Sequence, residues 1–243
     1  MYDPHLIFQT CYHRDTLVAL PVTLQYSVLY SNKDLLDKYN KTIPKTWDEL
    51  LKTSKFILNE EKKFNKDLIG YNGYFPDTED GLFSLYEFIY SYRNSKNSLF
   101  PELTSKESIE ALKMVKTIKE EISSDLAFHS DGYYSINKLA DGNSIFIKFW
   151  IFPDPYVNKA YKMTNLPGKK EGISASIASG SNISIFGNLP EDRKNATIIA
   201  YKFLTSKELQ EKYTSQHILM SGIPSIYKND NKCFLDLCNI LIF

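Results

Sequence analysis

The sequence predicts an α/β fold, and three observations support this assignment. Helix signals and strand-like runs alternate along the 243 residues without a long series of hairpins, an order typical of α/β domains. Capping boxes precede amphipathic segments, so helix starts are marked by side chains that satisfy free backbone N–H groups. Hydrophobic residues make up 43% of the chain, which is enough for a substantial core in one large domain or two small ones.

The first third of the chain predicts extended structure followed by two helices. Residues 17–30 are rich in Val, Leu, Thr and Tyr, and Pro21 interrupts them, so two extended segments joined at a bend are expected. A short helix follows in "NKDLLDKY". In "IPKTWDELL", Thr46 and Glu49 form a capping box, and the next helix is expected to end near the charged residues 59–67. Its inward face comprises Trp47, Leu50, Leu51, Ser54, Ile57 and Leu58.

The remainder predicts further helices and three strands. The letters "TSKE" occur at residues 104–107 and 205–208, and each copy reads as a capping box. A helical stripe follows the first copy, and another occupies residues 191–204 before the second. The first stripe comprises Ile109, Leu112, Val115, Ile118 and Ile122, and the second Ala196, Ile199, Ala200, Phe203 and Leu204. Strands are expected at residues 144–152, 173–178 and 182–186.

The charge balance excludes two classes of partner. Lys and Arg number 29, as do Asp and Glu, so no overall positive field favours nucleic acid or an anionic membrane surface.

The first residues contain no basic region followed by an apolar run, so no signal peptide is expected in the sequence as written. The final "CNILIF" is too short to span a bilayer.

No pattern of catalytic or metal-binding residues emerges. The cysteines Cys11, Cys233 and Cys238 fit neither a zinc site nor a disulfide framework, so their redox state stays open. The scattered histidines are His5, His13, His129 and His217, and none has ligand spacing. The common hydrolase, P-loop, zinc-protease and dinucleotide motifs are absent from the sequence. We therefore expect no enzyme, no metal and no cofactor.

Three sequence pieces carry a family resemblance when read in order. The first joins an "ALP" strand, an aromatic-Asn-Lys-Asp turn and a P-x-T-W-D-E helix start; the second is "KLADGNSIFIKFWIF"; the third runs from "LPGKKEG" to "SGIPS". The matching positions are Pro21, Tyr30, Asn32, Lys33, Asp34, Pro44, Thr46, Trp47, Asp48, Glu49, Gly180, Asn182, Phe203, Leu204, Thr205, Ser206, Glu208, Gln210, Gly222 and Pro224. Together they resemble the extracellular solute-binding proteins of ATP-driven sugar importers, of the maltose-binding type.

The resemblance implies a periplasmic-binding-protein-like type II fold, mostly its second lobe with fragments of the first. Residues 1–24 would be a remnant of lobe 1 with the first hinge, 25–172 lobe 2, 173–217 a return segment of lobe 1, and 218–243 the start of a return to lobe 2. Family members normally begin with an export signal and a βαβ series, so the chain is expected to be truncated. The concentration of Gly, Pro and Ser at residues 166–181 independently favours a passage between two bodies.

The resemblance also implies a function. The chain would bind a mono- or oligosaccharide in an interlobe cleft, as a monomeric component of a transporter, in a periplasmic or extracellular location. Three alternatives remain at this point: the ligand-sensing domain of a membrane receptor, a truncated remnant without function and, least favoured, a glycosidase-like enzyme. The candidate acids are Asp77, Glu79 and Asp80. Three acidic residues in one loop seldom provide the separated acid pair that a glycosidase needs.

Sugars are held between flat aromatic rings and groups that pair with hydroxyls. The resemblance places Trp150 at the family's stacking position, although a core tryptophan is the alternative. It places Gln25 where relatives have a ligand-contacting acid; a water-facing strand glutamine is the alternative. The segment "YNGYFPDTEDGLF" offers Tyr74, Phe75, Asp77, Glu79 and Asp80, which equally suit a surface turn.

Four further residues complete the candidate set. Ser181 and Asn182, after Gly180, could supply polar contacts from the other lobe, although Asn182 could instead cap or bridge strands. Tyr133 and Tyr134 precede an expected short helix and are interpreted as a staple for it.

Overall fold

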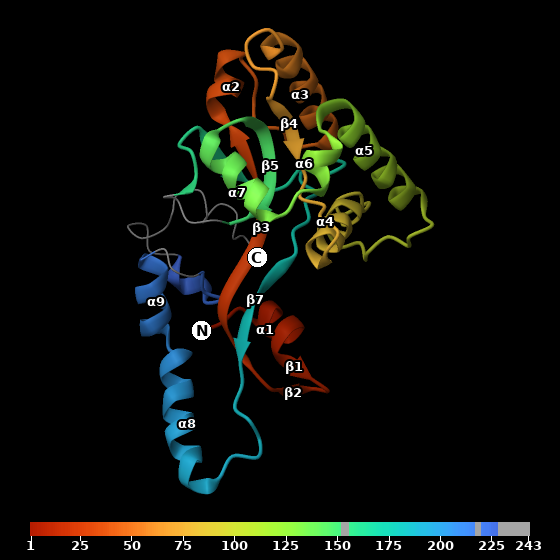
Figure 1. The fold of residues 1–243 in the computed structure, drawn as a ribbon. Helices are drawn as coiled ribbons and strands as arrows, with labels where there is room; N and C mark the ends of the chain where they lie inside the picture. The colour runs from red at the N-terminus through yellow and green to blue at the C-terminus, as the bar shows by residue number, and fades with distance from the viewer. Residues whose placement is uncertain (152–155, 217–219, 228–243) are drawn as a thin grey trace. The chain divides into compact units, whose positions relative to one another are not determined.

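The computed structural model describes residues 1–151, 156–216 and 220–227, and it divides the chain into two compact units. Unit 1 comprises Met1–Tyr26 and Ala178–Phe243, and unit 2 comprises Ser27–Ile177 (Figure 1). The sequence predictions for His217, Cys233 and Cys238 lie outside the described residues. No helix in the described residues is both long and apolar enough to cross a membrane.

A mixed sheet organises unit 2. Its strands are ordered β4 (Ile69–Asn72), β5 (Ser144–Trp150), β3 (Leu20–Asn32) and β6 (Tyr161–Thr164), and β3 enters this sheet from Ser27 onward. The pair β4 and β5 is parallel, whereas β3 is antiparallel to both β5 and β6. The carboxyl ends of β4 and β5 therefore lie at the same edge of the sheet.

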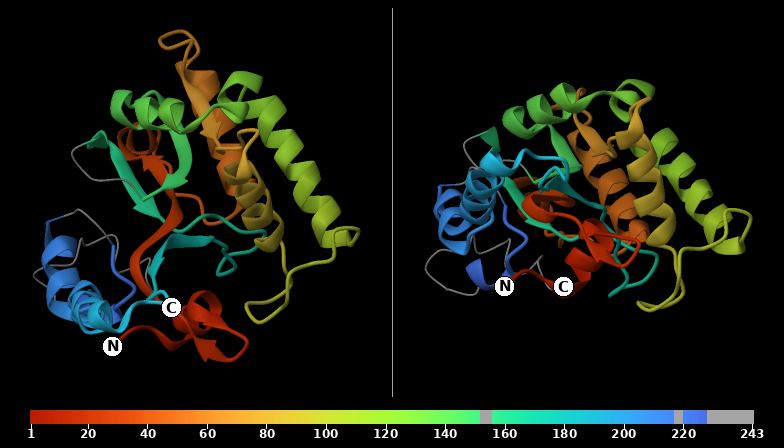
Figure 2. Two further views of the ribbon diagram at one scale, coloured as in Figure 1. Left: turned by 60° about the horizontal axis from the view of Figure 1, so that its bottom comes forward. Right: turned by 90° about the horizontal axis from the view of Figure 1, so that it is seen from below.

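Helices cover this sheet. They are α2 (Lys33–Lys38), α3 (Trp47–Glu61), α4 (Glu79–Tyr90), α5 (Lys106–Ile122), α6 (Asp125–His129) and α7 (Gly132–Asp141). Both α3 and α5 pack against β4, while α7 packs against β5. Figure 2 shows α3, α4 and α5 side by side, and α5 contacts each of the other two. The core between helices and sheet includes Leu29, Leu36, Trp47, Leu50, Ile57, Tyr71, Phe88, Ile118, Ile145 and Phe146. The predicted α/β class is confirmed.

The helix start at Thr46 has the geometry that the sequence predicts. The Thr46 hydroxyl accepts a hydrogen bond from the Glu49 amide at 3.2 Å, and the Glu49 carboxylate accepts one from the Thr46 amide at 3.2 Å. The helix then buries Leu50 and Ile57 completely. The capping box thus sets the first turn of a helix whose burial against β4 and α5 provides most of its stability.

Both "TSKE" predictions are wrong by one residue. Helix α5 is capped by Ser105, which accepts from the Ser108 amide at 3.3 Å, and α9 (Lys207–Ser215) is capped by Ser206, which accepts from the Leu209 amide at 3.3 Å. The serine in each motif takes the capping role from the preceding threonine. Neither helix therefore has the reciprocal glutamate bond of a capping box.

Two strand predictions also need correction. Residues 17–30 divide before the proline and not at it, because Leu17 ends a two-residue strand, residues 18–19 lie outside any strand, and β3 is continuous through Pro21 with only a register shift between Pro21 and Thr23. A bulge of this kind accommodates the proline, which has no N–H to donate. Residues 173–177 form no strand, since the Ile177 amide donates to the Glu87 carboxylate at 2.7 Å instead of to a neighbouring strand.

Unit 1 has a smaller two-stranded framework. Residues 20–26 of β3 pair antiparallel with β7 (Ala178–Ile183), and Gly180 approaches the backbone of Thr23 so closely that a Cβ there would lie 2.1 Å from the Thr23 oxygen. The other elements among its described residues are α1 (Pro4–Cys11), β1 (Tyr12–His13), β2 (Thr16–Leu17), α8 (Glu191–Leu204), α9 and the 3-10 helix η2 (Pro224–Ile226). Helix α8 contacts α9 but has no buried residue.

Candidate ligand-binding site

An aromatic and acidic group lies at the carboxyl ends of β4 and β5. Trp150 is the last residue of β5, Tyr74 lies in the loop after β4, and Asp80 lies in the first turn of α4. Because β4 and β5 are parallel, the structure places these three residues at one edge of the sheet. In an open α/β sheet, ligands bind outside the carboxyl ends of the strands.

The Asp80 carboxylate holds the two aromatic side chains. Its Oδ2 accepts a hydrogen bond from the Tyr74 hydroxyl at 2.8 Å, and its Oδ1 accepts one from Trp150 Nε1 at 3.3 Å. Tyr74 is buried and packs edge-on against Phe149, with ring centres 5.0 Å apart. Trp150 is only partly buried, so part of its side chain is accessible. We call Trp150, Asp80 and Tyr74 the Trp150 group.

A buried ion pair supports the Trp150 group from within the unit. Lys148 Nζ lies 2.8 Å from Glu87 Oε2 and donates to Ser84 Oγ at 2.7 Å. It also lies 5.6 Å from the ring centre of Tyr74 and 5.7 Å from that of Trp150, within the range of cation–π attraction. The ammonium therefore fixes both rings by electrostatics and not by packing alone.

The other carboxylate oxygen of Glu87 is also satisfied. Oε1 accepts hydrogen bonds from the Ser27 hydroxyl and from the Ile177 amide. Burial lowers the pKa of Lys148, and the nearby Glu87 and Asp80 carboxylates oppose that shift. Burial raises the pKa of the Tyr74 phenol, and the Asp80 carboxylate raises it further, so this hydroxyl stays protonated and donates.

A small cavity adjoins this ion pair. Its volume is about 10 Å³, and Phe75, Ser84, Glu87 and Lys148 are among its lining residues. Phe75 itself is held by stacking on Phe128, with ring centres 4.5 Å apart. It therefore lines the interior behind the Trp150 group, and the cavity has room for about one water molecule.

The remaining predicted site residues lie apart from this group. Asp77 and Glu79 are exposed, and in the part of the chain that the structure describes neither forms a hydrogen bond or ion pair with the Trp150 group. Gln25 is exposed on β3, where it pairs with Ser179 of β7. Ser181 is exposed on β7, and its amide donates to Thr23 Oγ1 at 2.9 Å. Gln25 and Ser181 thus belong to unit 1.

Asn182 has a structural contact, and the two remaining tyrosines of the candidate set belong to α7. Asn182 donates from Nδ2 to the Thr10 carbonyl at 2.8 Å. Tyr133 and Tyr134 do not precede the helix as predicted; they lie within the first turn of α7, which begins at Gly132 and is capped by Asp131.

Sequence reasoning missed the ion pair of Lys148 and Glu87. The signal was a single lysine inside the apolar run "SIFIKFW", since a charge in a buried strand needs a partner. Glu87 lies in "SLYEFIY", which contains the corresponding isolated acid. Among the described residues, no group of three or more His, Cys, Asp or Glu side chains could hold a metal ion.

The chain is similar in sequence and in structure to known proteins. The sequence model of a family described as "Bacterial extracellular solute-binding protein" matches residues 4–231. The maltose-bound MalE3 protein of T. maritima is 22% identical, with a TM-score of 0.77 over 95% of this chain and 60% of that chain. An ABC transporter solute-binding protein from Thermotoga lettingae TMO, bound with α-D-tagatose, is 20% identical, with a TM-score of 0.75 over 98% of this chain and 63% of that chain.

A third structure shows the same relationship. The cyclic α-maltosyl-1,6-maltose binding protein from Arthrobacter globiformis is 16% identical, with a TM-score of 0.72 over 98% of this chain and 62% of that chain. The chain thus spans less than two thirds of the length of each of these proteins. These similarities confirm the predicted type of fold.

Proposed function

Because the chain belongs to the bacterial extracellular solute-binding protein family, we propose that it binds a neutral mono- or oligosaccharide at the Trp150 group without altering it. The observation that carries the proposal is a partly accessible indole fixed beside a carboxylate, with Trp150 Nε1 3.3 Å from Asp80 Oδ1. The apolar face of a sugar ring stacks on the indole, and the sugar hydroxyls donate to the carboxylate.

The hydrogen-bonding capacity of Asp80 suits this role. An ionised carboxylate offers about four acceptor sites, and Tyr74 and Trp150 occupy two of them. The sites left over can accept from ligand hydroxyls without breaking the bonds that position the rings. A site prepared in this way loses little conformational entropy when the ligand arrives.

In this proposal the protein acts as a monomer outside the cytoplasm and delivers its ligand to the membrane component of a transporter. Gln25 and Ser181 add polar contacts from the other lobe, and residues 22–25 and 170–174 are the hinges. A ligand shifts the ratio of closed to open molecules from 1:99 to 99:1 only if it binds the closed form more tightly by about 5.5 kcal/mol. No catalytic step is involved.

The proposal is tested by isothermal titration of the full chain with neutral saccharides, and with amino acids and short peptides as competing classes. We expect saccharide binding that Trp150→Ala weakens at least about 10-fold and that Asp80→Asn weakens less, because the amide keeps one acceptor oxygen. Phe64→Ala, which removes an exposed aromatic ring elsewhere in unit 2, should leave the affinity unchanged.

Two outcomes would overturn the proposal. Binding of amino acids or peptides in preference to every saccharide would exclude the ligand class. Saccharide binding that Trp150→Ala and Asp80→Asn leave unchanged would exclude the Trp150 group.

A further inference from the structure

A second hollow lies at the opposite end of the same strands, at the amino end of β4. It has a volume of about 490 Å³ and is lined by residues from α3, α5 and α7 and from the loop that precedes β4. This volume lies within the range of about 300–1,000 Å³ for small-molecule sites. A neighbouring hollow of about 380 Å³ shares Leu58, Lys66 and Leu68 with it, so the two can form one extended groove.

The hollow is separate from the Trp150 group. The seven residues of β5 separate its amino end at Ser144 from Trp150 by about 20 Å at 3.3 Å per residue. None of the three residues of the Trp150 group lines the hollow. A ligand in the hollow therefore binds independently of one at Trp150.

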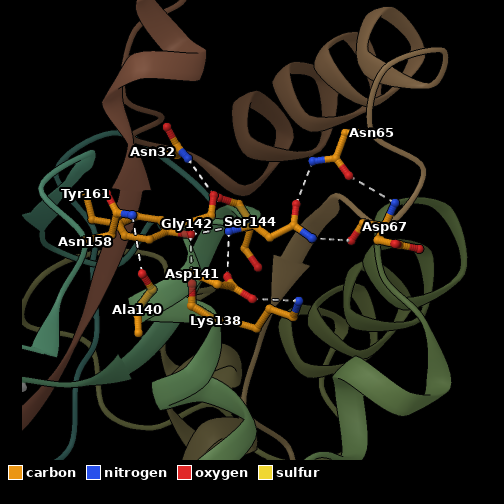
Figure 3. Close-up of polar contacts among 11 residues, drawn as sticks. Asn32, Asn65, Asp67, Lys138, Ala140, Asp141, Gly142, Ser144, Asn158 and Tyr161 are labelled. Carbon is orange, nitrogen blue, oxygen red and sulfur yellow. Dashed lines mark hydrogen bonds and ion pairs between the residues drawn. The ribbon is translucent and has the colours of Figure 1, made fainter.

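A network of amide side chains, drawn in Figure 3, includes residues that line the hollow. Asn143 Oδ1 accepts from Asn65 Nδ2 at 2.6 Å, and Asn143 Nδ2 donates to the Asp67 carbonyl at 3.2 Å. The Asp67 amide donates a hydrogen bond to Asn65 Oδ1 at 3.2 Å, so the three residues form a closed ring of hydrogen bonds. Asp67 lines the main hollow and Asn65 the neighbouring one, so this part of the lining is set before any ligand is bound.

The same network positions a cation that lines the hollow. The Asn143 amide donates to Asp141 Oδ1 at 2.7 Å, and Asp141 Oδ2 accepts from Lys138 Nζ at 3.2 Å. The turn between them depends on Gly142, whose φ of +75° is the left-handed conformation that favours glycine. The series of hydrogen bonds that orders Asp67 therefore also positions Lys138.

The charges that line the hollow balance. Lys66 and Lys138 line the hollow together with Asp67 and Glu121, and Glu121 already forms an ion pair with Lys55. A site of this kind offers no net attraction to an anion or a cation, while it presents alternating donors and acceptors. This pattern suits a neutral ligand that carries many hydroxyl groups.

The rest of the lining suits the carbon skeleton of such a ligand. Leu58, Ile122 and Leu126 provide apolar surface, and Tyr134 adds a partly exposed aromatic ring. Ser123 also lines the hollow, and its buried hydroxyl has no hydrogen-bond partner among the described residues. An unpaired buried hydroxyl is costly, so a nearby ligand hydroxyl would be favourable.

We propose that this hollow is a second carbohydrate site, which binds a neutral saccharide of one or two rings with a ring face on Tyr134 and hydroxyls on Asp67 and Lys138. The site is independent of the function proposed for the Trp150 group, because the two share no residue. It would give the chain a second point of contact with a saccharide outside any interlobe cleft.

The test uses isothermal titration of the full chain carrying Trp150→Ala, with maltose as the probe and glucuronate and glucosamine as charged analogues. We expect residual maltose binding that Tyr134→Ala weakens at least about 10-fold, the scale of one lost stacking contact. Tyr133→Ala is the matched control, since Tyr133 is the adjacent residue, is 79% exposed and does not line the hollow.

A second variant guards against a folding defect in Tyr134→Ala. Leu126 lines the hollow but is 72% exposed, so Leu126→Asp should fold normally while it replaces apolar lining for the sugar ring with a hydrated carboxylate and weakens maltose binding. Leu99→Asp, at a position that is 88% exposed and away from the lining, is its control.

Three results would overturn the second site: no maltose binding by the Trp150→Ala chain, equal binding by the Tyr134 and Tyr133 variants, or preference for a charged analogue. Failure of the Trp150 proposal has a different signature. In that case Trp150→Ala leaves all saccharide binding intact, and Tyr134→Ala alone removes it.

Discussion

Helices α3 and α8 show how differently the two units use similar sequence patterns. Both helices have apolar residues at helical spacing, yet α3 buries Leu50 and Ile57 completely whereas α8 buries no residue and leaves Ile199 and Phe203 largely exposed. Helix α3 packs against both β4 and α5, while α8 has its main contact, a small one, with α9 among the described elements. An apolar stripe therefore predicts a face that can be buried, and a neighbouring element decides whether it is.

The largest expected difference between the units is in amide hydrogen exchange. Amides of α3 and β5 should exchange only through global opening, whereas those of α8 should exchange through local opening. For a global stability of about 5 kcal/mol, protection in α3 would exceed that in α8 by about 10³-fold or more. Exchange of the full chain followed by mass spectrometry measures this ratio. Equal protection in both helices would show that α8 is as stable as α3 and would contradict the difference between the two units.

The buried ion pair of unit 2 should give the next largest effect. Lys148→Met leaves the Glu87 carboxylate buried without its cation, so the free energy of unfolding should fall by about 3–5 kcal/mol. The matched change in unit 1 is Lys194→Met, which removes an exposed pair with Glu191 and should cost less than about 1 kcal/mol. Urea unfolding of both variants tests this.

A second substitution separates loss of charge pairing from loss of packing. Adding Glu87→Gln to Lys148→Met removes the unpaired charge and should restore part of the lost stability. A double variant less stable than Lys148→Met would contradict this explanation.

Core packing can be compared with an identical substitution in each unit. Ile57→Ala removes a side chain that is 0% exposed and should lower the free energy of unfolding by about 2–5 kcal/mol. Ile199→Ala removes a side chain that is 69% exposed and should change it by less than about 0.5 kcal/mol. A large loss for Ile199→Ala in urea unfolding would show that α8 is buried in solution.

The smallest expected effect is a pH dependence confined to unit 2. Hydrogen bonds from Lys38 Nζ at 2.6 Å and the Tyr39 hydroxyl at 2.8 Å lower the pKa of Glu61 below its ordinary value near 4.5. Because the folded-state pKa is the lower one, this stabilisation is complete above about pH 4.5 and is lost as the pH falls through the folded-state value.

Thermal unfolding between pH 3 and pH 7 measures the Glu61 contribution. Glu61→Gln should flatten part of the loss of stability at acid pH, whereas Glu191→Gln, at an exposed pair on α8, should leave the profile unchanged. If thermal stability depends on pH in the same way for Glu61→Gln and for the unsubstituted chain, Glu61 does not contribute to the loss of stability at acid pH.

Sequence patterns predicted the parts of the fold that depend on local chemistry. The helix start at Thr46 and the strand that begins at Ser144 follow from capping groups and apolar residue type, and both are present. The sequence predicts the cap of α5 one residue early, at Thr104, because adjacent Thr and Ser can both serve and only backbone geometry selects Ser105. Local chemistry thus defined elements better than their ends.

The candidate site was less accessible to prediction because its contacts are distant in sequence. The sequence offers Trp150, Tyr74 and three acids in one segment as candidates, but it does not show which acid joins the two rings; the parallel pairing of β4 and β5 brings them together, and Asp80 is the acid that bonds to both. Glu79 and Asp77, one and three positions earlier, are exposed and form no hydrogen bond with either ring in the described residues. The direction of a side chain at a helix start depends on the exact residue at which the helix begins.

The two tryptophans of the chain occupy contrasting surroundings, and this gives the protein an intrinsic optical reporter. Trp47 is enclosed and stacked on Phe88, with ring centres 4.1 Å apart, so its emission reports a dry, constant environment. Trp150 lies between an ammonium, a carboxylate and solvent, so its emission responds to any change in local field or hydration. One unlabelled sample therefore carries both a reference signal and a responsive one.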